Sequence, residues 1–210
     1  MMEPLEMEFS EDPTNTAVIS DIASVMSDQD PPRKLSGTID SSIKMLEEEL
    51  APWEVENNNL LLTTKILLQQ FLLIRDAVYS DSNSRAHIEL IDTATQITDT
   101  TLDISEQITE LLPHCSHRSC CTDLEYCSNT LPPLSKQLMI TCTLVTANSN
   151  GYSGSDKEAL IGPHVKSMTD CLLKLLHAAY HAHLAGALDE EAVFLHWRSV
   201  DDSDDDSVVV

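Results

Sequence analysis

The stretch RAHIELIDTATQITDTTLDISEQITELLP, residues 85–113, decides the fold class. Its apolar and small residues recur at alternating intervals of four and three, at Leu90, Ala94, Ile97, Thr101, Ile104, Ile108 and Leu111. This spacing puts all of them on one face of an α-helix and sustains the face over about three heptads. Acidic residues occupy the other faces, at Asp92, Asp99, Asp103, Glu106 and Glu110. The stretch predicts a long amphipathic helix that packs one side against other helices and ends at Pro113.

Four further segments have helical patterns, at residues 36–52, 55–80, 119–149 and 156–186. Residues 55–80 are apolar nearly all round, so this helix is expected to be central and buried on several sides. In the segment 119–149, Ser119 or Thr122 is expected to cap the start, with acidic residues in the first turn. The tandem Pro132 and Pro133 are expected to kink that helix.

The composition agrees with a helical protein. Aromatic residues make up only 4% of the 210 residues, and Leu, Ile, Thr and Ala carry most of the apolar content. We therefore predict an all-α fold, an up-and-down bundle of four to five long helices with a short N-terminal helix over residues 17–28. The predicted organisation is a disordered acidic segment (1–16), the bundle (17–200) and an acidic disordered tail (201–210).

The formal net charge of −23 is unevenly spread. Residues 1–30 carry −8, residues 53–113 carry −7 and residues 188–210 carry −7, whereas residues 114–187 sum to zero. Such acidity opposes non-specific binding to nucleic acid, because phosphates are repelled. No apolar run approaches the ~20 residues of a membrane span, and no leader pattern is visible. We expect a soluble, cytoplasmic protein with reduced cysteines and no membrane insertion.

The stretch ELLPHCSHRSCCTDLEYC, residues 110–127, concentrates potential metal ligands. One hypothesis is a metal-binding regulator that uses His114, Cys115 and Cys120. The alternative is a tight turn between two helices, which we prefer because no C-x-x-C pair is present and zinc ligands usually come as two separated pairs. His177 and His181 are four residues apart, but Ala178 stands where an HExxH motif needs Glu. We therefore predict no metal, no cofactor and no catalytic residues.

The C-terminal SVDDSDDDSVVV places three aspartates directly after Ser203. Kinases that prefer acidic sequences favour such serines, so Ser203 is a candidate phosphorylation site. The terminal valines allow a second hypothesis, in which they enter a PDZ-type groove by strand addition.

Several landmarks occur in one order. Trp53 ends an early helical segment, and PHCSHRSCC follows the next two helices. His114 and Cys115 are followed five residues later by Cys120, and the last helix carries HAAYHAHLAG with Trp197 and Arg198 behind it. This order resembles the C-terminal actin-binding bundle of the α-catenin/vinculin family, and α-catenin more than vinculin. The resemblance covers about residues 17–200.

The resemblance implies a non-enzymatic five-helix bundle that binds actin filaments and helps to link cadherin–catenin complexes to the cytoskeleton at adherens junctions. It places the actin face on the last two long helices and the segment behind them, so the candidate contacts are Lys166, Lys174, Trp197 and Arg198. The family's bundle is rich in Lys and Arg, whereas residues 85–113 and the tail here are acidic, which should weaken binding to an acidic filament. The alternative function is a protein-interaction scaffold of the same fold that has lost actin affinity.

Overall fold

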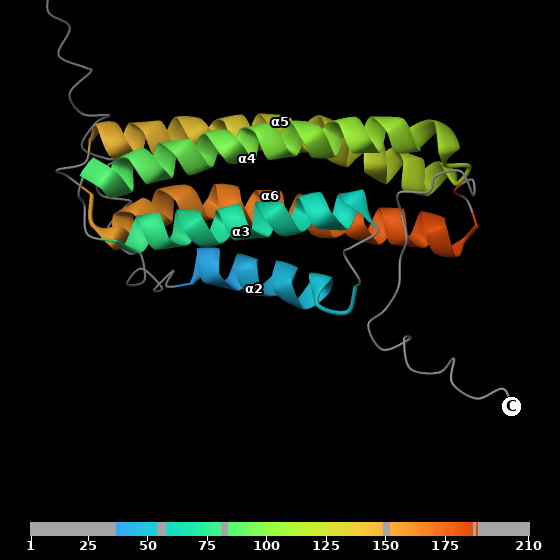
Figure 1. Ribbon diagram of the computed structural model, residues 1–210, viewed down its shortest axis with the longest axis horizontal. Coiled ribbons are helices and arrows are strands. Elements are labelled where there is room, and N and C mark those ends of the chain that lie inside the picture. The colour runs from blue at the N-terminus through green and yellow to red at the C-terminus, as the bar shows by residue number, and fades with distance from the viewer. Residues whose placement is uncertain (1–36, 54–57, 81–83, 149–151, 187, 189–210) are drawn as a thin grey trace, which may run out of the picture. The chain divides into compact units, whose positions relative to one another are not determined.

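The computed structural model describes residues 37–53, 58–80, 84–148, 152–186 and 188. All described residues belong to one compact unit. Their helices are α2 (Thr38–Leu50), α3 (Asn59–Tyr79), α4 (Ser84–Leu111), α5 (Arg118–Ala147) and α6 (Gly154–Leu184), with a 3₁₀ turn η2 (Leu112–His114). Figure 1 shows that α3 to α6 run up and down beside one another, with the shorter α2 next to α3 and α6.

The predicted all-α, up-and-down bundle is therefore confirmed. The proposed helix over residues 17–28 and the two tails lie outside the described residues, so the domain boundaries at 16, 17, 200 and 201 stay predictions. Among the described residues, no helix combines the length and apolarity that a membrane crossing requires.

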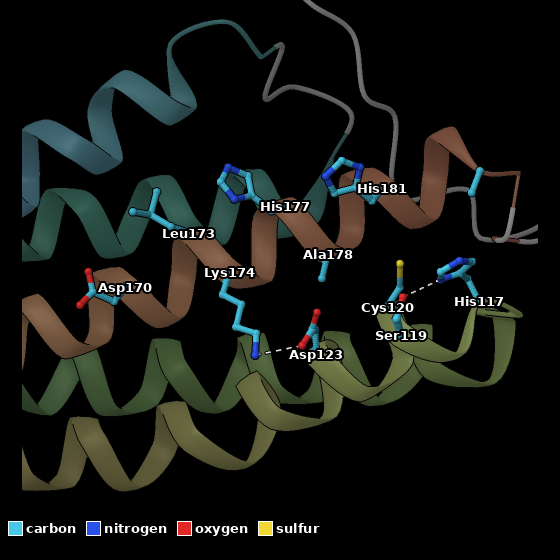
Figure 2. Close-up of a pocket in the computed structure, with 11 residues that line it drawn as sticks. His117, Ser119, Cys120, Asp123, Asp170, Leu173, Lys174, His177, Ala178 and His181 are labelled. Atoms are coloured by element: carbon cyan, nitrogen blue, oxygen red, sulfur yellow. Dashed lines mark hydrogen bonds and ion pairs between the residues drawn. The ribbon is translucent and has the colours of Figure 1, made fainter.

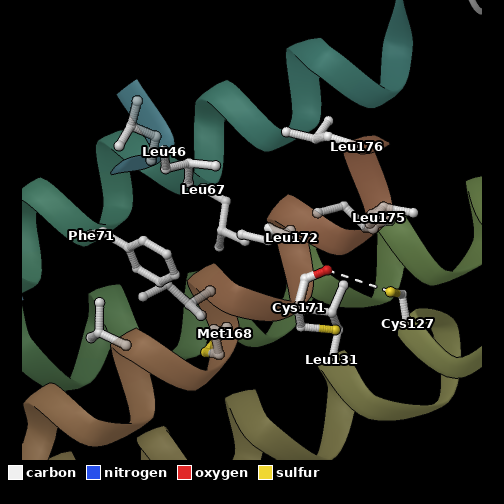
Figure 3. Packing of buried hydrophobic residues seen from close by; sticks show 14 of the residues in the cluster. Leu46, Leu67, Phe71, Cys127, Leu131, Met168, Cys171, Leu172, Leu175 and Leu176 are labelled. Atoms are coloured by element: carbon white, nitrogen blue, oxygen red, sulfur yellow. Dashed lines mark hydrogen bonds between the residues drawn. The ribbon is translucent and has the colours of Figure 1, made fainter. Parts of the chain in front are cut away.

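The helix over Ser84–Leu111 buries the face that its sequence predicts. All seven positions spaced by four and three are at most 2% exposed. The other helices contribute to the same core, and Figure 3 shows Leu67 and Phe71 of α3 near Met168 and Leu172 of α6. All six cysteines are free thiols, and Cys127 donates its thiol hydrogen to the carbonyl oxygen of Cys171 at 3.4 Å.

The expectation that α3 is buried on several sides is confirmed, but one flank of the helix is exposed. α3 packs against α2, α4 and α6, yet Leu62, Ile66 and Leu73 are 46%, 46% and 52% exposed. The sequence pattern could not reveal this flank, because apolar residues occupy all faces of the helix and only the arrangement of neighbours decides which face is covered.

The N-terminus of α5 also differs from the expectation. Its N-cap is His117, which makes no side-chain cap hydrogen bond, and the first turn holds no acidic residue. The Ser119 hydroxyl instead lies 3.0 Å from the Nδ1 atom of His117, and the Thr122 hydroxyl donates to the carbonyl of Arg118. Neither residue caps the helix, because the helix begins one or more residues before each of them.

A hydroxyl of α4 satisfies one backbone carbonyl that a proline inside α5 leaves without its helical donor. Pro132 has no N–H, so the carbonyl of Ser128 lacks its usual helical donor. The Ser105 hydroxyl of α4 donates to this carbonyl at 3.0 Å, and the Thr101 hydroxyl donates to Ser135 at 2.9 Å. The helix is continuous from Arg118 to Ala147, and the expected kink stays a prediction.

A capping box begins α6 two residues earlier than expected. The Ser153 side chain accepts from the backbone N–H of Asp156, and the Asp156 carboxylate accepts from the backbone N–H of Ser153. This reciprocal pair satisfies two donors that a helix start leaves open, so the helix begins at Gly154.

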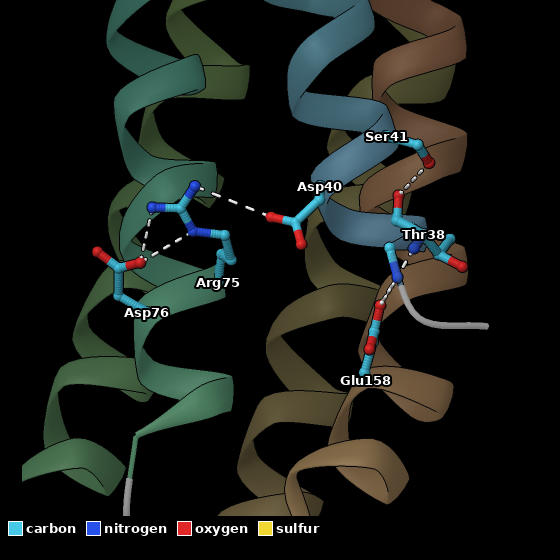
Figure 4. Close-up of polar contacts among 7 residues, drawn as sticks. Thr38, Asp40, Ser41, Arg75, Asp76 and Glu158 are labelled. Atoms are coloured by element: carbon cyan, nitrogen blue, oxygen red, sulfur yellow. Dashed lines mark hydrogen bonds and ion pairs between the residues drawn. The ribbon is translucent and has the colours of Figure 1, made fainter. Parts of the chain in front are cut away.

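The short helix α2 is attached to α6 by a carboxylate and by a close contact. Oε1 of Glu158, a buried residue, accepts from the backbone N–H groups of Gly37 and Thr38 at 3.0 and 3.1 Å, which puts a carboxylate at the positive end of α2 (Figure 4). Gly162 faces Thr38 so closely that an added Cβ would lie 3.2 Å from the Thr38 Cβ. Gly162 is therefore the residue that lets α2 approach α6.

Candidate functional site

Two of the four predicted actin contacts lie on one side of α6. Lys166 and Lys174 are separated by eight residues, which is close to two helical turns, and Asp170 lies between them. Both lysines are exposed, with side chains 57% and 44% accessible. Trp197, Arg198 and the candidate phosphorylation site Ser203 lie outside the described residues.

Each of the two lysines is already paired with a carboxylate. Nζ of Lys166 lies 2.5 Å from Oδ2 of Asp170, one turn further along α6. Nζ of Lys174 lies 2.9 Å from Oδ1 of Asp123 on α5 and 4.4 Å from the centre of the Tyr126 ring. The hydrogen bond to Asp123 raises the pKa of Lys174 above its ordinary value. The two lysines therefore do not present the uncompensated positive charge that the sequence comparison with a basic family implied.

We call the surface formed by these groups the α5–α6 face, which comprises Lys166, Asp170 and Lys174 of α6 with Asp123 and Tyr126 of α5. A pocket of about 620 Å³ opens beside it, between the first turns of α5 and the last turns of α6 (Figure 2). Its lining includes His117, Asp123, Lys174, His177 and His181. Nε2 of His177 lies 3.1 Å from Oε1 of Glu49, so α2 also contributes to this end of the bundle.

Sequence reasoning missed the acidic partners on this face. Asp170 could have been found, because a Lys and an Asp four residues apart on a helix commonly pair. Asp123 and Tyr126 had no such signal. Their contact with Lys174 depends on the register between α5 and α6, which is a tertiary property.

The cluster around His114, Cys115 and Cys120 forms the turn between α4 and α5. Cys115 ends η2 and donates its thiol hydrogen towards the His117 carbonyl, and the Cys121 thiol donates to the Cys115 carbonyl at 3.0 Å. Burial raises the pKa of Cys115 to about 11, which favours the thiol over the thiolate that a metal requires. Among the described residues, no group of three or more His, Cys, Asp or Glu side chains converges on a possible metal position. The contacts are those of a packed turn.

Two landmarks of the family resemblance pack against one another. The ring centres of Trp53 and Tyr180 are 4.6 Å apart with their planes inclined by 56°. The turn residue Cys115 forms an isolated antiparallel bridge with Leu188, just beyond α6. These contacts hold Trp53 and Leu188 against the bundle.

Comparisons with known proteins agree with the helical architecture. No protein-family model matches the chain. A curated vinculin from Drosophila melanogaster is 27% identical over 157 residues, which cover 72% of this chain and 16% of that protein. A solved structure of a vinculin homologue from a sponge superposes with a TM-score of 0.68 at 18% identity, covering 85% of this chain and 22% of the sponge chain.

The chain thus spans about a fifth or less of the length of these two proteins. The match in sequence and the match in fold together show that this chain is similar to part of the vinculins and shares a vinculin-like helical fold.

Proposed function

We propose that this chain is a non-enzymatic helical module of the cytoskeletal and cell-adhesion machinery, located in the cytoplasm at cell junctions, and that it binds actin filaments weakly. The observation that carries the proposal is the similarity of its bundle to the vinculins. In this role the module links cadherin–catenin adhesion complexes to the cytoskeleton.

The charge distribution favours the α5–α6 face for a filament contact. Residues 114–187 sum to zero charge, whereas the preceding residues 53–113 carry −7. An acidic filament is repelled least by the neutral half of the bundle. Lys166 and Lys174 are the proposed contacts on the described surface, and Trp197 and Arg198 complete the proposed set. The pairing of both lysines with aspartates explains why we expect low affinity.

Co-sedimentation with filamentous actin tests this function, at low salt and at physiological salt. We expect a pelleted fraction that is larger at low salt, because exposed charges are screened as salt rises. If the chain stays in the supernatant at both salt concentrations, it does not bind actin directly.

A charge-matched pair of variants locates the contact. Asp123→Asn with Asp170→Asn leaves Lys166 and Lys174 without their carboxylates and should lower the Kd for actin several-fold. Asp99→Asn with Asp103→Asn changes the net charge equally, on α4. If both double variants bind actin equally better, net charge alone governs binding and the α5–α6 face is not the contact.

The second candidate function is a protein-interaction scaffold of the same fold without actin affinity. Its specific support is the compensated charge of the α5–α6 face together with the acidic tail, where phosphorylation of Ser203 would add further negative charge. Deletion of residues 201–210 tests whether the tail docks partners. If partners recovered with the intact chain are all retained by the truncated one, the tail is not the docking element.

A further inference from the structure

The two helices α3 and α4 are held in register by a pair of side-chain hydrogen bonds. Nε2 of Gln70 donates to the Thr100 hydroxyl and Nε2 of Gln107 donates to the Thr63 hydroxyl, both at 2.9 Å. These four residues mark the line along which the two helices meet. Residues one turn away from them lie on the same side of each helix and therefore beside this line.

An apolar row borders the line on α3. Ile66 follows Thr63 by three residues and precedes Gln70 by four, so it lies on the side of α3 that approaches α4. Leu62 and Leu73 lie four residues before and seven residues after Ile66, which extends the row along the helix. All three side chains are about half exposed.

An acidic row borders the same line on α4. Asp103 follows Thr100 by three residues and precedes Gln107 by four, as Ile66 does on α3. The row comprises Asp92, Asp99, Asp103, Glu106 and Glu110, all exposed and spaced by seven, four, three and four residues. At 1.5 Å per residue it extends for about 27 Å. We call the two rows together the α3–α4 face.

No Lys, Arg or His side chain of the described residues neutralises a carboxylate of the acidic row. Some other exposed carboxylates of the described chain pair with cations, as in Arg85 with Glu89 and Lys166 with Asp170. None of the five carboxylates of the acidic row takes part in an ion pair within the described residues. Like charges one helical turn apart destabilise a helix, so a partner that supplies cations would relieve a real cost.

We propose that the α3–α4 face binds an amphipathic helix of another protein that carries apolar residues beside a basic flank. The apolar residues of the partner pack on Leu62, Ile66 and Leu73, and its Lys or Arg side chains reach the acidic row. This is a helix-on-helix mode of recognition in which the charges select the partner and its orientation. The site is separate from the α5–α6 face and does not depend on actin binding.

The same charges argue against other occupants. Residues 1–30 and 188–210 of this chain carry −8 and −7, and a second copy carries −23. Each of these would bring negative charge to a negative row. Nucleic acid is disfavoured for the same reason. A basic helix from a different protein is the occupant that the face complements.

A pair of synthetic peptides of about 20 residues, long enough to span the acidic row, tests the proposal against the full chain. The basic peptide has leucines at intervals of four and seven, matching the apolar row, with lysines on one flank. The acidic peptide replaces those lysines by glutamates. We expect fluorescence anisotropy to show binding of the basic peptide that weakens with salt and no binding of the acidic one.

Two matched pairs of variants locate the binding. Asp99→Asn with Asp103→Asn should raise the Kd of the basic peptide by up to about tenfold. Glu47→Gln with Glu125→Gln alters exposed acids on α2 and α5 and should leave this Kd nearly unchanged. Ile66→Ser with Leu73→Ser should also weaken binding of the basic peptide. Ile140→Ser with Leu144→Ser alters exposed apolar residues of α5 and should leave that binding unchanged. Circular dichroism checks that each variant folds.

The proposal is overturned if the basic peptide does not bind at low salt, if both peptides bind equally, or if the control variants reduce binding as much as the α3–α4 variants do. Actin co-sedimentation of the same proteins tests the proposed function separately. Loss of peptide binding would therefore leave the actin proposal standing, and loss of actin binding would leave the helix-binding proposal standing.

Discussion

At the scale of single residues, ion pairs and hydrogen bonds determine what the α5–α6 face presents to a partner. Lys174 is held by Asp123 across two helices and lies over Tyr126, and Lys166 is held by Asp170. Exposed pairs of this kind contribute little to stability, typically about 0–1 kcal/mol. Their consequence is functional, because they cancel the local positive charge that a filament-binding surface would otherwise offer.

His164 provides a pH-dependent contribution at the same scale. Its Nε2 atom lies 3.0 Å from the Thr141 hydroxyl, and burial lowers the pKa of His164 below 6.5. The neutral form is therefore favoured in the folded state, so the stabilisation is fully present above the unfolded pKa and is lost as pH falls through the folded pKa.

We expect the unfolding free energy to respond less to acidification in His164→Gln than in the unmodified chain between about pH 7 and pH 5. Urea denaturation at several pH values measures this difference, with exposed His183→Gln as the control. Other groups titrate in the same range, so the comparison between variants carries the result. Identical pH profiles for the unmodified chain and His164→Gln would contradict the assignment.

At the scale of elements, hydroxyl groups at the contact between α4 and α5 form hydrogen bonds to backbone carbonyls of the other helix. In a regular helix such carbonyls already accept from their own helix. The Ser105 hydroxyl donates to the Ser128 carbonyl that Pro132 leaves without a helical donor. The Ser128 hydroxyl donates back to the Ser105 carbonyl at 3.4 Å. The helical donor that is missing at Pro132 is thus replaced by the Ser105 hydroxyl of α4.

Ser105→Ala should lower the unfolding free energy by about 1 kcal/mol, because it leaves a partly buried carbonyl without a partner. Denaturant titration followed by circular dichroism measures the change. Thr122→Ala removes a hydroxyl that only bonds back to its own helix at an exposed position, and it should change stability by less than about 0.5 kcal/mol. Equal losses in the two variants would show that the bridge to α5 has no special role.

At the scale of the whole molecule, the bundle separates two kinds of surface. The α3–α4 face combines exposed apolar residues with acids that have no ion pair among the described residues, and the α5–α6 face combines lysines with acids that neutralise them. A chain with a net charge of −23 also repels itself, which opposes the compact state.

The Tm should therefore rise by about 5 °C or less between about 20 and 300 mM NaCl, as salt screens this repulsion. Differential scanning fluorimetry measures the shift. The Asp99→Asn with Asp103→Asn variant should start from a higher Tm and gain less from salt. A Tm that falls with added salt would mean that attractive ion pairs outweigh the repulsion.

The sequence by itself determined the helices, their order and the buried face of α4. Periodicity is a local property, and it placed Leu90, Ile97, Ile104 and Leu111 correctly in the core. Pro113 indicated the end of α4 to within two residues, since the helix ends at Leu111. The ordered landmarks around Trp53, His114 and Tyr180 also indicated a helical bundle of the kind that the vinculin-like fold shows.

Only the tertiary structure decided which surfaces are exposed and which charges are free. α3 is apolar on all sides, so its outer flank at Leu62, Ile66 and Leu73 became visible only from the positions of the neighbouring helices. Likewise, Lys174 loses its free charge to Asp123, 51 residues earlier in the chain. The physical reason is the same in both cases: exposure and ion pairing depend on distances between helices, and these distances are set by packing and register rather than by any local pattern.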